Sequence, residues 1–265
     1  MSYQITILGC GSSGGVPRVG PDWGACDSTN PRNRRRRCSI FVTQDGPQGR
    51  TQVLVDTSPD LREQLLGIGI DRIDGILMTH PHADHTHGID DVRPLVIKAR
   101  HRIGIHMDMA TAAVVRRTFS YIFETPAGSL YPPLLDDRRI ASGTAVTIEG
   151  PGGTVVAMPF AVHHGEIDAL GYRFGRIAYS PDLNAIPDSS IAHLRDLDLW
   201  IIDALRYSRH PSHFSLDETL GWIERMRPRR AVLTNLHTDM DYDALAARLP
   251  SNIEPAYDGM VLQGA

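Results

Sequence analysis

Short apolar runs, several of them alternating with polar residues, dominate the first third of the chain and recur after residue 145, whereas helical spacing of apolar residues prevails in between and near the end. Alternation with a period of two is typical of β-strands, and apolar residues three and four apart are typical of helices. The predicted strands cover residues 3–8, 39–43, 52–55, 74–78, 146–148, 154–160, 171–174, 176–180, 199–202 and 231–233. The predicted helices cover residues 61–66, 84–99, 109–123, 215–226 and 243–249.

This order of elements favours two packed sheets with helices on the outside over a doubly wound parallel sheet, in which strands and helices would alternate throughout. No low-complexity linker and no short repeat interrupts the sequence. We therefore predict an α/β fold made of a single domain over residues 1–265.

A glycine-rich loop over residues 9–15 follows the first predicted strand and contains a G-x-G-x-x-G match. A dinucleotide site would need a helix directly after this loop, so that the helix N-terminus meets the pyrophosphate. Val16-Pro17 and then Gly20-Pro21 follow instead, and no helix can start there. The loop is better explained as a tight turn at which the backbone passes close to another group.

The composition is that of a globular protein, with 42% hydrophobic and 22% charged residues. A formal net charge of −4 is too close to neutral for a protein that holds nucleic acid mainly through a basic surface. Three cysteines do not make a disulfide framework, the N-terminus lacks the basic region of a signal peptide, and no stretch approaches the roughly 20 apolar residues of a membrane span. The sequence predicts a soluble cytoplasmic protein that does not contact a membrane.

Histidine is the unusual residue, with 12 copies, three of which gather with Asp84 directly after a predicted buried strand. His80 and His82 are two residues apart, so in extended backbone both side chains point the same way and can hold one metal ion. Asp84 and His85 begin a predicted helix, where the bend turns them toward a second position about 3.5–4 Å away, the separation in two-metal hydrolases. Imidazole and carboxylate ligands suit zinc, manganese or iron.

Four side chains cannot complete two metal sites, and further candidates follow the ends of other predicted strands. These are His163 and His164, then Asp182, and then Asn235 and His237. Strand ends along one edge of a sheet bring side chains from distant parts of the sequence together. Asp182 is the natural carboxylate to bridge two metal ions.

The run over residues 79–85 resembles the H-x-H-x-D-H signature of the metallo-β-lactamase superfamily of metallohydrolases. Matches at His164, Asp182 and His237 extend the resemblance over essentially the whole chain. The glycine-rich loop, the stretch Asn33-Arg34-Arg35 and the segment that begins with His213-Phe214 are most similar to the phosphodiesterase branch, which contains the phosphoribosyl cyclic phosphate phosphodiesterase of phosphonate degradation.

The resemblance implies a four-layer αββα sandwich of two mixed sheets and two divalent metal ions, zinc or manganese, with iron as a further candidate. The implied ligands are His80, His82 and His164 for one ion and Asp84, His85 and His237 for the other, with Asp182 shared. The resemblance does not fix the substrate, because the superfamily covers lactams, thioesters, lactones, RNA and cyclic phosphates.

Two departures from the family pattern affect these expectations. Pro21 and Trp23 stand where members of the branch often carry the cysteines of a structural zinc site, so we do not predict that zinc. Asn235 stands where the last histidine ligand commonly follows a threonine, and His237, two residues on and on the same face of extended backbone, is the expected ligand. The alternative is a weakened second metal site.

Asp84 and His213 are the expected catalytic residues, with His213 as a proton donor to the leaving group or a contact to phosphate. A partly buried His213 that donates to backbone is the alternative. Arg34 and Arg35 are candidate phosphate contacts because guanidinium groups match phosphate oxygens in pairs, although such arginine runs are usually solvated.

Three other residues are expected to support the ligands without binding metal: Asp56, His163 and Asn235. The choice between His163 and His164 as the ligand falls on His164, because a small residue follows the histidine in the family pattern.

The sequence therefore predicts a dinuclear metal-dependent hydrolase, in first place a phosphodiesterase in which water activated between two metal ions attacks a small cyclic phosphodiester or nucleotide. Three alternatives remain: a thioester or lactone hydrolase, an endoribonuclease of the tRNA-processing kind, and a non-catalytic nucleotide- or metal-binding module. The expected partner is a small phosphorylated substrate and not nucleic acid, and a homodimer is compatible with the sequence.

Overall fold

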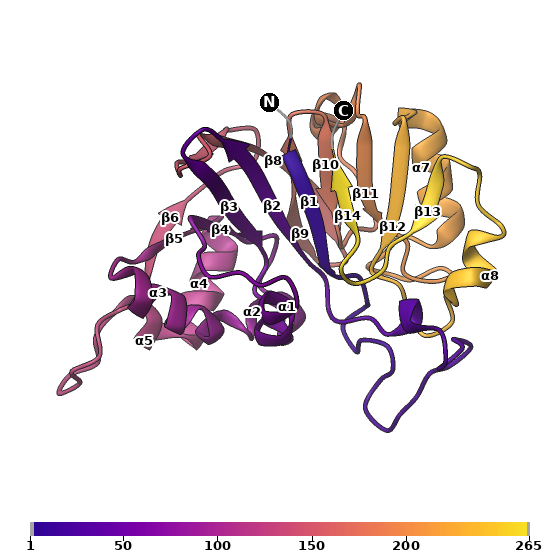
Figure 1. Cartoon of the computed structure of the whole chain (residues 1–265). Coiled ribbons are helices and arrows are strands. Elements are labelled where there is room, and N and C mark those ends of the chain that lie inside the picture. The colour runs from indigo at the N-terminus through magenta and orange to yellow at the C-terminus, as the bar shows by residue number, and fades with distance from the viewer. Residues whose placement is uncertain (1–2, 264–265) are drawn as a thin grey trace.

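The computed structural model describes residues 3–263, which form two seven-stranded sheets that face each other (Figure 1). The first sheet contains β1 (Tyr3–Gly9), β2 (Ser39–Gly46), β3 (Gly49–Val55), β4 (Gly75–Leu77), β5 (Ile103–Met107), β6 (Leu135–Arg139) and β14 (Val261–Gln263). The second sheet contains β7 (Val146–Ile148), β8 (Val155–His164), β9 (Ile167–Phe174), β10 (Ile177–Ser180), β11 (Leu199–Asp203), β12 (Arg230–Thr234) and β13 (Ile253–Pro255).

Both sheets are mixed. In the order β14-β1-β2-β3-β4-β5-β6, pairing is antiparallel as far as β3 and parallel from β3 to β6. In the order β13-β12-β11-β10-β9-β8-β7, the strands from β10 to β13 are parallel and those from β7 to β10 are antiparallel. Parallel strands end at the same edge, so the loops after them are placed to build a common site.

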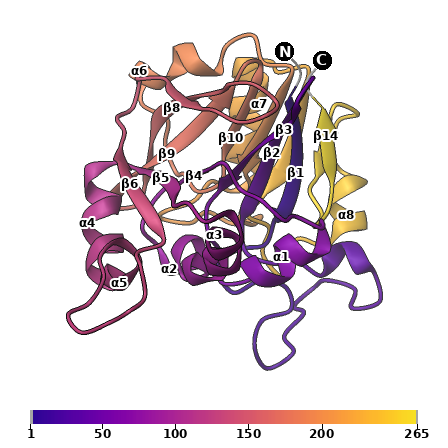
Figure 2. The ribbon, with the colours of Figure 1, turned by 60° about the vertical axis from the view of Figure 1, so that its left-hand side comes forward.

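Helices cover the outer face of each sheet. Figure 2 shows α1 (Leu61–Gly67) and α3 (Arg93–Ala99) in front of the first sheet. The other helices of the first half are α2 (Ala83–Thr86), α4 (Met109–Thr118) and α5 (Ser120–Phe123). Those of the second half are α6 (Asp188–Ile191), α7 (Leu216–Met226) and α8 (Tyr242–Ala246). The arrangement confirms the predicted four-layer αββα sandwich.

Three apolar cores are present, one between the two sheets and one between each sheet and its helices. The strand sequences explain this arrangement. On β2, Ile40 and Val42 face the second sheet, while Phe41 between them packs against the helical layer with Leu61 and Leu65 of α1. A strand buried on both faces must be apolar at successive positions, so such strands read as continuous hydrophobic runs. In the second half, Trp200 on β11 packs outward against α7 in the same way.

Several predicted helices and strands differ in extent from the observed ones. The helix predicted over residues 84–99 is split into α2, a 3₁₀ turn (Ile89–Val92) and α3. Four observed strands, β5, β6, β13 and β14, were not predicted, and β8 runs on to His164. Within residues 3–263, no helix has the length and apolarity needed to cross a membrane.

Candidate metal centre

Four histidines and an aspartate from both sheets meet at one edge of the sandwich. His80 and His82 lie in the turn after β4, His85 in α2, His164 at the end of β8 and Asp182 just after β10. Two overlapping triads have all their ligand atoms within 4.8 Å of one another, namely His80, His82 and His164, and His80, His85 and Asp182. Strand ends from opposite sheets therefore supply one compact set of potential metal ligands.

The potential ligand atoms of this cluster point toward one another. Asp182 Oδ1 lies 3.3 Å from His85 Nε2, and Asp182 Oδ2 lies 3.8 Å from His164 Nε2 and 4.0 Å from His80 Nε2. Three of these atoms are buried: His80 Nε2, His85 Nε2 and Asp182 Oδ1. Among residues 3–263, none of them has a hydrogen-bond partner at a suitable distance and angle. Because unpaired buried polar atoms are costly, this set fits bound cations.

The other ring nitrogens of these histidines are held by neighbouring groups. Asp56 Oδ2 lies 2.7 Å from His85 Nδ1, and the same carboxylate accepts hydrogen bonds from the backbone N–H and hydroxyl of Thr79. His164 Nδ1 donates to the backbone carbonyl of Ser212 over 2.7 Å. These contacts direct both Nε2 atoms into the cluster, which is how partners beyond the ligands orient a metal site.

Burial and charge set different protonation states within the cluster. Burial lowers the pKa of His80 and of His164, so both rings are neutral at pH 7 and have a free lone pair for a metal ion. Burial also lowers the pKa of His85, but the carboxylates of Asp182, Asp84 and Asp56 outweigh it and hold that pKa well above its ordinary value. Without metal, His85 is therefore the histidine of these three that holds a proton most strongly.

We expect metal binding to release protons from His85. A cation at Nε2 must displace the proton, so the apparent affinity for zinc rises with pH until the pH exceeds the raised pKa of His85. His80 and His164 are already neutral and contribute little to this release. Calorimetric titration of zinc into metal-free protein, in two buffers with different heats of ionisation, measures the number of protons released. Heats that do not depend on the buffer would contradict the expectation.

His213 and Asp203 form a second pair beside the cluster. His213 Nδ1 lies 2.9 Å from Asp203 Oδ2 and 3.9 Å from Asp182 Oδ2. Burial raises the pKa of Asp203 to about 7. Burial lowers the pKa of His213, but the charge of Asp203 and its hydrogen bond outweigh this and bring it to about 9. The imidazole is thus held by Asp203 and protonated at neutral pH.

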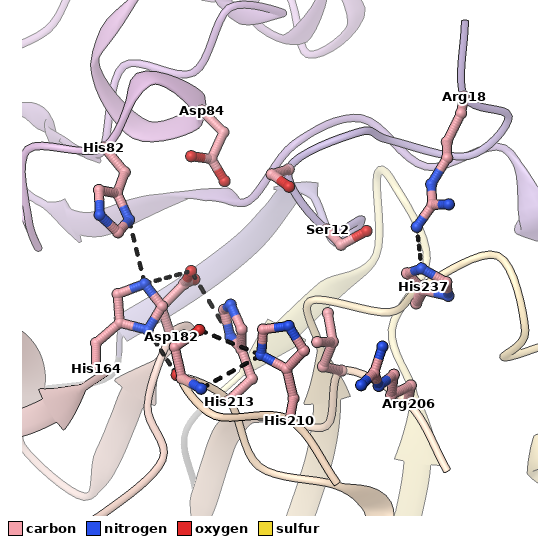
Figure 3. A pocket seen from close by; sticks show the side chains of 13 residues that line it. Ser12, Arg18, His82, Asp84, His164, Asp182, Arg206, His210, His213 and His237 are labelled. Carbon is pink, nitrogen blue, oxygen red and sulfur yellow. Dashed lines mark hydrogen bonds and ion pairs between the residues drawn. The ribbon is translucent and has the colours of Figure 1, made fainter. Parts of the chain in front are cut away.

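A pocket of about 280 Å³ opens over these residues (Figure 3). His82, His164, Asp84 and Asp182 line one side, and Arg18, Arg206 and His237 line the other. Leu205 is the one apolar residue among the described residues that line it. The pocket suits a small, polar, anionic ligand.

The family model for the β-lactamase superfamily domain matches residues 51–235, a span that includes the His80–His85 segment, His164 and Asp182. The chain belongs to the metallo-β-lactamase superfamily. Its sheets, helices and His/Asp cluster are those of a hydrolase of this superfamily, with ligand groups that can hold metal.

Three known proteins are similar to this chain. A solved structure described as a new diphosphatase from the PhnP family is 37% identical, with a TM-score of 0.89 over 99% of this chain and 97% of the other. The octanoyltransferase of Porphyromonas gingivalis is 31% identical over 97% of this chain, which spans about half (51%) of that protein. Zinc-bound PqqB from Methylobacterium extorquens, 18% identical over 98% of this chain and 99% of the other, shares the fold with a TM-score of 0.74.

This metallo-β-lactamase superfamily member does not bring His237 into the cluster, contrary to the ligand set inferred from its sequence. His237 Nε2 accepts from the guanidinium of Arg18, and its Nδ1 lies 2.8 Å from Asp239 Oδ1. Asn235 has a left-handed backbone with a φ of 61°, so the chain is not extended there and His237 does not share its face. The buried Asn235 amide instead donates to Asp203.

The arginine run also lies elsewhere than expected. Arg35 is only 2% exposed and donates to the carbonyls of Met240 and His237, while Arg34 stacks on the Trp23 ring. Arg36 and Arg37 form ion pairs with Asp258 and Asp60. None of the four lines the pocket beside the cluster, so the expected phosphate contact of Arg34 and Arg35 is wrong for this pocket.

Replacing Arg35 by methionine is expected to lower the free energy of unfolding by about 2–4 kcal/mol, because buried carbonyls and the Asn33 side chain lose their charged donor. Urea denaturation measures the loss. Arg34→Met, which removes an exposed guanidinium from the same run, is the matched control and should cost less than about 1 kcal/mol. Equal losses in the two variants would show that Arg35 has no special structural role.

Of the other residues predicted for the site, some lie at the cluster and one does not. Asp56 contacts His85, and Asp84 Oδ2 lies 3.5 Å from His85 Nε2. His163 is exposed and pairs with Asp168, away from the cluster. The sequence analysis missed Asp203, Arg18 and Arg206. Asp203 directly follows the strand predicted over residues 199–202, so the strand-end argument that selected Asp182 applies to it equally.

Proposed function

We propose that this chain is a dinuclear metal-dependent phosphodiesterase that acts on small substrates. The observation that carries the proposal is the set of buried, unpartnered ligand atoms at His80, His85 and Asp182, next to a protonated His213. The ligands we assign are His80, His82 and His164 for one ion and Asp84 and His85 for the other, with Asp182 shared. Zinc and manganese are the proposed metals, since both accept imidazole and carboxylate ligands.

The residues of the chain have distinct parts in this chemistry. Two divalent cations held there would lower the pKa of a bound water and offset the negative charge of a phosphate group. Asp182 lies beside His85 and His164, which are assigned to different ions. Asp56 contacts Nδ1 of His85 and so keeps Nε2 directed into the cluster. His213, oriented through Nδ1 by Asp203, can give the proton on its Nε2 to the departing oxygen. The chain needs no covalent nucleophile for this reaction.

The pocket favours phosphoryl over acyl substrates. A thioester or lactone hydrolase would be expected to offer apolar surface to an acyl chain, whereas this pocket is lined almost entirely by polar and charged groups. Two arginines complement phosphate oxygens well and bring no advantage for a neutral acyl group. The likeness to a diphosphatase of the PhnP family, at 37% identity over nearly the whole chain, supports the same class of substrate.

Metal analysis coupled to a hydrolysis panel tests the proposal. We expect two metal ions per chain after reconstitution with zinc or manganese, and turnover of cyclic phosphates and simple phosphodiesters well above that of thioesters and lactones. Faster turnover of a thioester or a lactone would overturn the phosphodiesterase assignment. A single bound metal after reconstitution would overturn the dinuclear one.

A further inference from the structure

The three residues that follow β10 and Pro181 contact both the metal-ligand side and the proton-donor side of the centre. Asp182 is the carboxylate assigned to both metal ions. The Leu183 N–H donates to Asp203 Oδ2 over 3.1 Å, and the Leu183 carbonyl accepts from the Phe214 N–H over 2.7 Å. Asn184 has no part in the proposed chemistry so far, yet its side chain joins two separate loops.

The half-buried Asn184 side chain forms one hydrogen bond to each of these loops. Its Oδ1 accepts from the backbone N–H of Gly165 over 2.9 Å, and its Nδ2 donates to the Pro211 carbonyl over 3.0 Å. Because an N–H can only donate and a carbonyl can only accept, these two partners require both halves of an amide. A carboxylate at this position could serve Gly165 but not Pro211, and an apolar side chain could serve neither.

The two loops carry groups with different parts in the proposed reaction. Gly165 follows His164, the proposed metal ligand at the end of β8. Pro211 lies two residues before His213, the proposed proton donor, in the segment between β11 and α7. His164 and His213 both line the pocket (Figure 3), and their ring centroids are 4.6 Å apart. The amide of Asn184 therefore connects the ligand side of the pocket to the donor side.

The backbones of the two loops approach each other closely. Gly165 has a left-handed backbone with a φ of 61°, and an added Cβ there would lie 2.9 Å from Ser212 Cβ. Beside this contact, His164 Nδ1 donates to the Ser212 carbonyl over 2.7 Å. Asn184 thus adds a second hydrogen-bonded connection next to the first, between the neighbouring residues Gly165 and Pro211.

The donor loop depends on these connections more than the ligand loop does. β8 and β9 pair as far as His164 and Ile167, so the turn at Gly165 is held by the hairpin that it closes. Residues 207–214, which carry His213, belong to no helix or strand. A change at Asn184 is therefore expected to displace His213 and to leave His164 in place.

We propose that Asn184 is a positioning residue that fixes the proton donor His213 relative to the metal ligands. The inference rests on the proposed function, because it assigns Asn184 to the proton-transfer step of that reaction. Asn184 is not among the described residues that line the pocket, so it acts through the loop over residues 207–214. Small displacements of a general acid lower kcat strongly, since the proton must be transferred over hydrogen-bond distance.

Kinetics of Asn184→Ala test this role in the zinc-loaded protein. We expect kcat for an alkyl phosphodiester to fall about 10-fold or more, with two metal ions per chain retained. The loss should be smaller for a nitrophenyl phosphodiester, whose leaving oxygen departs without a proton. In a His213→Ala background the same substitution should lower kcat by less than about 2-fold, because the group that Asn184 positions is already absent.

Two further variants separate this effect from a general loss of loop contacts. Asn184→Asp keeps an acceptor for Gly165 but loses the donor for Pro211, so its kcat should be as low as that of Asn184→Ala. Asn30→Ala is the matched control, because the Asn30 amide also uses both halves, accepting from the Arg32 N–H and donating to Asp243, each over 3.0 Å. Asn30 is not among the described pocket residues, and this variant should keep wild-type kcat and metal content.

Proton NMR of the zinc-loaded protein gives a readout that needs no turnover. The Nδ1 protons of His213 and His85 are hydrogen-bonded to Asp203 and Asp56, so both should resonate far downfield. Asn184→Ala should shift or broaden the His213 signal and leave the His85 signal unchanged. His213→Ala, in which one of the two signals is missing, identifies them.

An unchanged His213 signal in Asn184→Ala would overturn the inference. Equal kcat losses from this substitution with and without His213 would also overturn it, and so would loss of metal, which would assign Asn184 to the ligand side. A His213 signal that changes in a protein that hydrolyses no phosphodiester would support the positioning of this ring by Asn184 and overturn only the proposed activity.

Discussion

Asp182→Ala is expected to lose metal from both halves of the cluster and to reduce phosphodiester hydrolysis by about 10³-fold or more. The carboxylate lies within 3.3–4.0 Å of His85, His164 and His80, so it contacts histidines assigned to both metal ions. Metal ions are worth several kcal/mol to a phosphoryl-transfer transition state, and each 1.36 kcal/mol or so corresponds to a factor of ten. Elemental analysis and turnover number measure the two effects.

Asp188→Ala provides the comparison for this variant. Asp188 is exposed at the start of α6, a few residues further along the chain, and its removal should change neither metal content nor turnover. Asp182→Asn keeps an oxygen ligand but loses the charge, so it should retain more metal than the alanine variant. Two metal ions per chain in Asp182→Ala would refute the shared role of this carboxylate.

His213→Ala is expected to lower kcat by about 10²–10⁴-fold while both metal ions stay bound, because the variant loses the proposed proton donor. The Asp203 carboxylate at 2.9 Å raises the pKa of His213 to about 9, so the wild-type ring is protonated at neutral pH. The loss should be smaller for a substrate with a nitrophenolate leaving group, since that oxygen departs without a proton. Comparing kcat for alkyl and nitrophenyl phosphodiesters measures the difference.

The position of His213 makes a second outcome informative. His213, His164 and Asp182 also have ligand atoms within 4.8 Å of one another, so the ring is close enough to bind metal. Metal loss in His213→Ala would make it a ligand that replaces the expected His237. His210→Ala, which removes a neighbouring pocket histidine, is the control and should keep a kcat well above that of His213→Ala.

The sequence predicted those parts of the centre that depend on local spacing. His80, His82, Asp84 and His85 are fixed relative to one another by one short turn after a buried strand, so their grouping follows from the chain alone. Asp182 and the pair His163 and His164 were located because they follow the ends of predicted strands, and the family pattern selected His164 from the pair. Neither argument needs knowledge of contacts between distant segments.

The errors came from contacts between segments far apart in the sequence. His237 was expected to be a ligand because, in extended backbone, it would lie on the same face as position 235. The left-handed φ of Asn235 instead turns His237 toward Arg18, more than 200 positions earlier. Arg35 was expected to contact phosphate because its actual acceptors, the carbonyls of His237 and Met240, lie about 200 residues further along the chain. Spacing along the chain carries no signal for either contact.

Local packing explains the split helix. At Gly88, between α2 and α3, an added Cβ would lie 1.9 Å from the Ser58 carbonyl oxygen, and the Gly88 N–H donates to Thr57. The helical spacing of apolar residues continues through this point, but the close approach of the 57–58 backbone interrupts the helix. The missed strand β6 has the sequence LDDRR, which has no apolar alternation.

The pairing of β1 with β14 has a consequence for the order of folding during synthesis. Gln4, Ile5 and Thr6 are paired with Gln263, Leu262 and Val261, so β1 acquires one of its two neighbours only after the other described strands have been synthesised. Such distant pairing slows folding and leaves a strand edge open to other chains in the meantime. Until β14 has been synthesised, the edge of β1 that carries Gln4, Ile5 and Thr6 is therefore unpaired in the growing chain.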